Sequence, residues 1–327
     1  RMYTAIPKLA LQDRIHKLLL QQYAIWMNSP LFIPCAQYVH IAGELIWIAW
    51  KERLLVERIR RKCAQVEEML NRNHFHWEQA FWQMLSKNFG LSVNAEAFAD
   101  MAVSIPLLLL WKHKNEVSQL EALLLGQAGL LEGDFSDSYP QLLQKEYTFY
   151  RTKYSLNKIS FPIHFLRMRP SGFPTVRLAQ LAMLIHQSPP LFAAIRDTTE
   201  IGELRQLLFV EASPYWHCRF AFDEPSVFQP KRLGPQMVNN IIINTIIPMV
   251  FTYGYLRKEE RYQRKALDWI RQLPAEKNAV SMQFEKLGIF SASAGDTQSL
   301  KELKTQYCDQ RRCLDCAIGA AILKRNS

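Results

Sequence analysis

The sequence predicts an all-α protein, built as an irregular multi-helix bundle or helical array in one large domain or two packed lobes. Two patterns support this: apolar residues recur every three or four positions through most of the chain, whereas strand-like alternation is scarce. The chain has 327 residues, of which 49% are hydrophobic and 12% aromatic, so it can bury a large core. No repeat of fixed length occurs, which argues against a solenoid of identical units.

Helical spacing of apolar side chains is clearest in six segments, namely residues 9–27, 38–70, 77–89, 117–131, 139–154 and 175–185. Residues that end or begin helices agree with these segments. Gly90 is a C-terminal stop and Pro174 belongs in a first helical turn. Asp296 or Thr297 can cap the helix that leads to Cys308. About a dozen helices would account for most of the chain.

Loops rich in Pro, Gly and Ser separate the helices, but none is long enough to be a clear interdomain linker. We expect an N-terminal helical lobe over residues 1–140 and a C-terminal lobe over residues 141–327. The apolar run at 241–256 approaches the length of a membrane span, yet it contains Asn244 and Pro248, so it is predicted to be a buried helix and no membrane partner is expected.

Small residues gather on one face of the predicted helix at 117–131. Ala122, Gly126 and Gly129 would allow another backbone to approach closely, because each Gly otherwise costs about 1 kcal/mol of helix stability relative to Ala. Glu121 and Gln127 lie beside this face, and the pattern leaves open whether they are buried polar groups or face solvent.

Positive charge is the strongest functional signal in the composition. Lys and Arg outnumber Asp and Glu by 40 to 30, giving a formal charge of +10, which favours polyanionic partners such as DNA or RNA. Residues 147–196, here called the basic stretch, contain no acidic side chain. Its seven cations are Arg151, Lys153, Lys158, Arg167, Arg169, Arg177 and Arg196.

One part of the basic stretch has the pattern of an anion site, because a Ser–Gly turn directly precedes the helix that begins near Pro174. Backbone amides of such a turn, with guanidinium groups beside them, bind phosphate well. The predicted site comprises Arg167, Arg169, Ser171, Gly172 and Arg177. Interleaved aromatic residues would stack bases; alternatively, they form core and the arginines pair with distant carboxylates at Glu200, Glu203 or Glu211.

Three of the six cysteines lie close together near the end of the chain, with the spacing C-x4-C-x2-C. Thiolates at this spacing can hold zinc or an iron–sulfur cluster, with a fourth ligand from elsewhere in the fold. The predicted ligands are Cys308, Cys313, Cys316 and Cys35, with His217 and Cys218 in reserve for the fourth position. The alternative is a set of reduced thiols without metal. Either state fits a reducing, cytoplasmic compartment.

No catalytic motif is recognisable, so the sequence assigns no enzyme activity. The segment from His74 to Glu78 contains two histidines, but their alternate spacing does not converge on one helix face, which disfavours a metal site. The chain begins at Arg1, and we expect this end to be a truncation or a processed end.

Four blocks, at residues 119–129, 169–177, 243–248 and 307–319, together resemble an uncharacterised bacterial family that is known as a domain of unknown function. The resemblance spans nearly the whole chain. It implies a further N-terminal segment with a nuclease-like fold, which this chain would lack, so that the remainder is a helical companion domain.

Three functions remain as expectations. The first is a helical intracellular protein that binds nucleic acid or another polyanion through the basic stretch. The second is an accessory part of a nuclease or other enzyme whose active site lies in the absent segment, and the third is a protein interaction scaffold.

Overall fold

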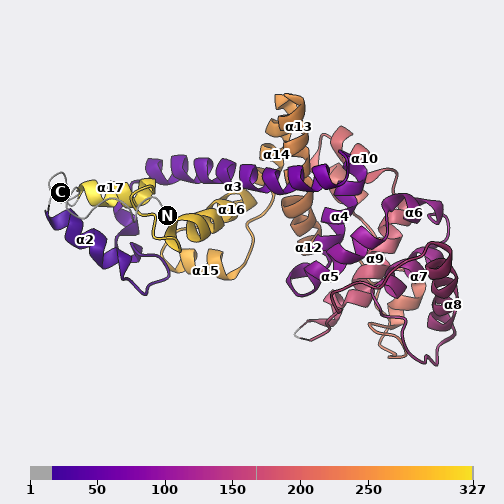
Figure 1. Ribbon diagram of the computed structural model, residues 1–327. Helices are drawn as coiled ribbons and strands as arrows, with labels where there is room; N and C mark the ends of the chain where they lie inside the picture. The colour runs from indigo at the N-terminus through magenta and orange to yellow at the C-terminus, as the bar shows by residue number, and fades with distance from the viewer. Residues whose placement is uncertain (1–16, 167, 326–327) are drawn as a thin grey trace. The chain divides into compact units, whose positions relative to one another are not determined.

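The computed structural model describes residues 17–166 and 168–325. Every regular secondary-structure element within these residues is a helix (Figure 1). Extended structure in this part of the chain is limited to isolated bridges, so the all-α prediction is confirmed. The chain divides into two compact units. Unit 1 combines residues 1–62 with 267–327, and unit 2 comprises residues 63–266. The boundary suggested by the sequence, after residue 140, falls inside helix α8 (Ser138–Lys153) of unit 2.

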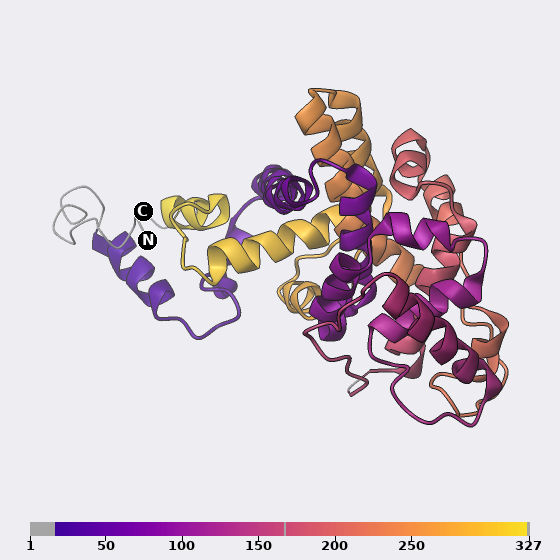
Figure 2. The same cartoon turned by 45° about the vertical axis from the view of Figure 1, so that its right-hand side comes forward.

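Unit 1 is assembled from the two ends of the chain. Its helices are α2 (Lys17–Met27), the 3-10 helix η2 (Ala36–Ile41), most of α3 (Glu44–Arg72), the end of α14 (Glu260–Gln272), α15 (Ala279–Lys286), α16 (Ala294–Glu302), the π-helix η6 (Leu303–Cys308) and α17 (Ala317–Arg325). Helix α16 runs beside the first half of α3 in both views (Figures 1 and 2). Two contacts join them: Ser299 donates to the Lys51 carbonyl at 2.7 Å, and Lys51 pairs with Asp296 at 2.7 Å.

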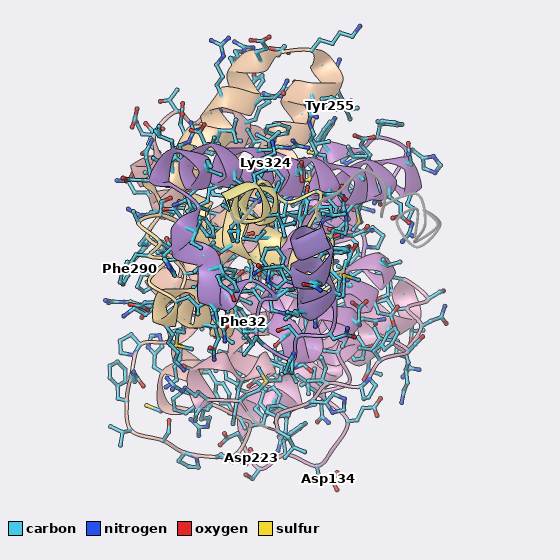
Figure 3. The ribbon with its side chains drawn as sticks, turned by 90° about the vertical axis from the view of Figure 1, so that its left-hand side faces the viewer. Phe32, Asp134, Asp223, Tyr255, Phe290 and Lys324 are labelled. Atoms are coloured by element: carbon cyan, nitrogen blue, oxygen red, sulfur yellow. The ribbon has the colours of Figure 1, made fainter. Side chains whose placement is uncertain are left out.

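Unit 2 is a larger helical bundle. Beside α8 it contains α4 (Trp77–Phe89), α5 (Leu91–Ser104), α6 (Leu107–Lys112), α7 (Val117–Gln127), η3 (Pro170–Gly172), α9 (Pro174–Gln187), α10 (Leu191–Asp197), α11 (Ile201–Leu207), η4 (Pro214–Cys218), α12 (Pro235–Ile241), the π-helix η5 (Ile242–Ile246) and α13 (Ile247–Arg257). Helix α7 packs against both α8 and α9, and its whole second half is buried. The loop before α8 is fastened by Asp223, which accepts the Asp137 amide at 2.9 Å, and Figure 3 shows Asp223 beside the loop that carries Asp134.

Most helix ends follow the predicted signals. Gly90 is the C-cap of α4, and Pro174 is the first residue of α9. Helix α16 differs in detail, because its N-cap is Ser293, whose side chain accepts the Asp296 amide while the Asp296 carboxylate accepts the Ser293 amide. The predicted helix at 38–70 is two elements, since Gly43 separates η2 from α3.

The apolar run near residue 250 is a buried helix, as predicted. In the described chain, Pro235–Arg257 is continuous and has the length and apolar character of a membrane span, and 78% of its most apolar window is buried inside the protein. A second candidate exists only if α9 and α10, which are bent by 69°, are counted as one span.

The predicted close approach of two helices occurs between α7 and α8. A Cβ atom on Gly126 would lie 2.1 Å from Cγ of Tyr147, so the Tyr147 ring occupies the space that any larger residue would need. The Tyr147 hydroxyl donates to Gln127 at 2.9 Å. The sequence left open whether Glu121 and Gln127 are buried or face solvent. Both are almost completely buried. Gly129 has a φ of +74° just after the helix end, where Gly is favoured.

Glu121 is a carboxyl group in the core of unit 2. Its Oε2 accepts hydrogen bonds from Trp216 Nε1 and the Tyr139 hydroxyl, both at 2.9 Å, whereas its Oε1 and the Ser213 hydroxyl both lack a hydrogen-bond partner. Burial raises the pKa of Glu121 above its usual value of 4.5. A protonated Glu121 can donate from Oε1 to Ser213, which satisfies both groups.

This arrangement predicts how stability depends on pH. Because the folded state binds the Glu121 proton more tightly than the unfolded state, the contribution of Glu121 is fully present below pH 4.5 and is lost as pH rises through the folded pKa. Glu121→Gln keeps the acceptor and provides a permanent donor, so we expect it to raise the free energy of unfolding at about pH 8 and to flatten its pH dependence. Urea unfolding at about pH 5 and about pH 8 measures this. Glu224→Gln, at an exposed loop position, is the control. Parallel pH profiles for wild type and Glu121→Gln would contradict the expectation.

Candidate functional site

The predicted phosphate site lies at the turn that precedes α9. Its described residues occupy η3 and the start of the helix: Arg169, Ser171, Gly172 and Arg177. Arg167 lies outside the described residues. The turn is closed by a hydrogen bond from the Gly172 amide to the Arg169 carbonyl at 2.8 Å, with Gly172 buried and the Arg169 side chain exposed. Pro174 is the first residue of α9 and has no N–H group. The first backbone amides of this helix are therefore those of the residues after Pro174.

Arg177 is the most unusual residue of this turn. Its guanidinium is largely desolvated, and burial alone lowers its pKa to about 10. Nη1 donates to Gln180 Oε1 at 2.9 Å, but the buried Nε has no hydrogen-bond partner. Within residues 17–166 and 168–325, no carboxylate pairs with Arg177. A cation in this setting gains much from a bound anion, since its own surroundings do not neutralise it.

A second buried cation connects to the same glutamine. Gln180 Nε2 donates to the Lys231 carbonyl at 3.0 Å, and the Lys231 side chain is 5% exposed. Its Nζ lies 3.6 Å from the centroid of the Phe220 ring, a cation–π contact. Burial lowers the pKa of Lys231. Gln180 therefore joins the Arg177 guanidinium to the backbone of Lys231, a second cation with little exposure.

Within the described part of the basic stretch, no arginine forms an ion pair with a carboxylate distant in sequence, although one lysine does. Lys158 pairs with Glu132 at 2.5 Å, and Arg196 pairs with its neighbour Asp197 at 2.8 Å. Glu211 was an expected partner of these arginines, but its carboxylate lies 2.7 Å from Arg232 and 3.0 Å from His217 instead. Glu203 instead accepts the Thr199 amide at 3.3 Å.

The aromatic residues of the basic stretch differ in exposure. Tyr150 is 4% exposed, and the half-buried Phe165 and Phe173 rings pack edge to face with their centroids 5.3 Å apart. Phe149 and Phe161 are 59% and 50% exposed, and Phe149 lies beneath Lys153 Nζ at 5.4 Å. Part of the predicted base-stacking surface is therefore packed against other side chains, and part of it is exposed.

Unit 1 contains a charge cluster that the sequence pattern did not single out. It consists of Arg58, Arg61, Lys62, Glu276, Lys301 and Glu302, contributed by α3, α16 and the loop before α15. Arg58 Nη1 lies 3.3 Å from Glu302 Oε2, and Arg61 Nε lies 3.2 Å from Glu302 Oε1. Both Arg58 and Glu302 are buried. Burial, followed by the charge of Arg58, lowers the pKa of Lys62 to about 7.

A signal for this cluster exists in the sequence. Arg58 follows Leu54 by one helical turn on the apolar face of α3, and an arginine in such a row needs a buried partner. The cluster has four cations and two carboxylates, and unit 1 as a whole is also basic. Lys and Arg outnumber Asp and Glu by 19 to 11 in unit 1 and by 21 to 19 in unit 2. Unit 1 therefore has the larger net positive charge, and in unit 2 the cations of the basic stretch are largely offset by acidic residues elsewhere in the unit.

The structure places all four predicted metal-ligating cysteines in one apolar core of unit 1. Cys35 precedes η2, Cys308 ends η6, Cys313 lies in the following loop, and Cys316 is the residue before α17; each is no more than 8% exposed. The reserve residues His217 and Cys218 belong to unit 2 instead. Burial and the neighbouring thiols raise the pKa of Cys35 to about 12 and that of Cys313 to about 11. Among the described residues, no three His, Cys, Asp or Glu side chains are at metal-ligand spacing.

A family model described as a protein of unknown function, DUF2851, matches residues 1–279, most of the chain. The chain belongs to the DUF2851 family. No curated protein and no solved structure matches it. The DUF2851 match confirms the resemblance to a family of unknown function. The match includes Cys35 and all residues of the predicted anion site, and it ends before Cys308.

The DUF2851 chain also has a groove of about 760 Å³ in unit 2, between the end of α3, α4 and α5, and its lining includes His74, His76 and Asp100. Two of these side chains already have structural tasks. His76 Nδ1 accepts the Gln79 amide at 3.1 Å as the N-cap of α4, and Asp100 accepts the Ser160 amide.

Proposed function

We propose that this DUF2851 protein binds a phosphate-bearing polyanion, nucleic acid in the first place, at the turn before α9. Arg177 carries the proposal, because it is a desolvated guanidinium with an unused Nε and no carboxylate partner in the described chain. Arg169 and Ser171, which are both exposed, would complete the site with a cation and a hydroxyl group, Gly172 shapes the turn, and Arg167 would add a further cation.

The energetics favour an anion here. A charge held away from water without a counter-ion destabilises the folded state, and a bound phosphate would remove that cost while forming charge-assisted hydrogen bonds to the guanidinium. The net charge of +10, most of it in unit 1, would attract a polyanion from a distance.

The test is binding of labelled single-stranded DNA, double-stranded DNA and RNA to the full chain, followed by fluorescence anisotropy at several salt concentrations. We expect affinity to fall with salt, and Arg169→Ala or Arg177→Ala to weaken binding by about ten- to a hundredfold, the value of a hydrogen bond to a charged group. Each variant should also reduce the salt slope by about one phosphate contact. Arg205→Ala, at an exposed position on α11, is the matched control.

A stability measurement separates binding from folding. Because Arg177 has no carboxylate to leave behind, Arg177→Met should leave the free energy of unfolding of the ligand-free protein unchanged or increased, while nucleic-acid binding falls. Binding that is insensitive to salt, or equal losses for Arg205→Ala and Arg177→Ala, would contradict the proposal. It would favour the accessory-domain or scaffold function instead.

A further inference from the structure

The core that contains the four cysteines is drawn from both ends of the chain. Cys35 comes from the first segment of unit 1, and Cys308, Cys313 and Cys316 come from the last. The remaining two cysteines, Cys63 and Cys218, lie in unit 2. The four thiols come from segments about 270 positions apart in the sequence. Four is also the number of ligands in a tetrahedral thiolate site.

The core around these sulfurs also contains a buried indole N–H. Trp50 is 4% exposed and belongs to the same core as the four cysteines, and its Nε1 has no hydrogen-bond partner in the described chain. A buried donor without a partner is unfavourable in an apolar core, whereas beside a metal centre it can donate to a thiolate sulfur.

The backbone of the cysteine loop is fixed by close contacts. The Arg312 amide donates to the Tyr307 carbonyl at 2.9 Å, and the Asp315 amide donates to the Arg312 carbonyl at 3.2 Å. A Cβ on Gly319 would lie 2.3 Å from the Cys313 carbonyl oxygen, so the start of α17 is pressed against this loop. The backbone therefore holds Cys313 close to the start of α17, which Cys316 directly precedes.

We propose that Cys35, Cys308, Cys313 and Cys316 bind one metal centre through four thiolates, either a zinc ion or an iron–sulfur cluster, which fastens the first segment of unit 1 to the last. The cation supplies the positive charge that four buried sulfurs lack, and each thiol releases its proton to solvent as its sulfur binds. Because unit 1 is closed by this centre, metal binding adds directly to its folding free energy. This inference is independent of the anion site in unit 2.

The experiment is elemental analysis of the full chain, purified anaerobically under reducing conditions, together with its visible absorption. We expect one metal centre per chain: zinc without colour, or iron with the absorption of a cluster. Cys35→Ser and Cys316→Ser should lose the metal, whereas Cys63→Ser and Cys218→Ser, the matched controls, should keep it. A wild-type protein that contains neither zinc nor iron overturns the proposal, as does wild-type metal content in Cys35→Ser.

A second measurement does not depend on variants that can lose their fold. Removing metal from the wild-type protein with a chelator should lower the midpoint of thermal unfolding, because the bound metal stabilises the folded state. A midpoint that is the same before and after chelation overturns the proposal.

Discussion

Glu302→Ala is expected to lower the free energy of unfolding by about 3–5 kcal/mol, the usual cost of breaking a buried ion pair from one side. Glu302 and Arg58 have side-chain exposures of 4% and 7%, and Glu302 is the carboxylate that both Arg58 and Arg61 contact. Its removal leaves the Arg58 guanidinium buried beside Lys62 and without its principal counter-charge.

Urea unfolding of the full chain and its variants tests this expectation. The control is Glu68→Ala, which breaks the exposed ion pair of Glu68 with Arg72 and should cost no more than about 1 kcal/mol. A double variant, Arg58→Met with Glu302→Leu, should recover most of the loss because the buried Arg58–Glu302 ion pair is then replaced by apolar side chains. Similar costs for Glu302→Ala and Glu68→Ala would show that the charge cluster is solvated in solution.

Gly126→Val should destabilise unit 2 by about 3 kcal/mol or more, since an added Cβ would overlap the Tyr147 ring at 2.1 Å. The ring cannot move away cheaply, because its hydroxyl is bonded to the buried Gln127 and α8 carries it. Even Gly126→Ala should be destabilising, although Ala improves helix propensity by about 1 kcal/mol.

The matched control is Gly202→Ala in α11, where nothing lies within 4 Å of the new Cβ, so the substitution should be neutral or stabilising. Combining Gly126→Ala with Tyr147→Ala should cost less than the sum of the two single substitutions, because the overlap then disappears. Thermal or urea unfolding of the four proteins measures the coupling. Additive costs would mean that α7 and α8 do not meet at Gly126.

The sequence predicted which segments are helical, but it did not predict which helices far apart in the chain pack together. The spacing of apolar residues predicted that α4, α7, α8 and α9 are helices, and Gly126 indicated a close contact on α7. Both signals are local in the sequence. The division into two units could not be predicted, because it depends on the packing of residues 17–62 against residues 267–325. Arg58 and Glu302 are 244 positions apart, so periodicity could place Arg58 on an apolar face without identifying its partner.

The candidate sites follow the same rule. The turn before α9 was visible as Ser171, Gly172 and Pro174, but the isolation of Arg177 from carboxylates became known only when the helices were packed. The choice of Cys35 as a companion to the C-terminal cysteines rested on a turn at Pro34, and the structure places it in the same core. Whether a metal joins them remains a proposal.

The discontinuous composition of unit 1 has a consequence for biosynthesis. A ribosome delivers residues 17–62 first, then all of residues 63–266, and only afterwards the segment that completes the unit. At about 5–20 residues per second, the early helices wait roughly 10–40 s with apolar faces such as that of Trp50 uncovered. Unit 2 can collapse during this interval, so nascent chains should need protection by a chaperone at their N-terminal helices until synthesis ends.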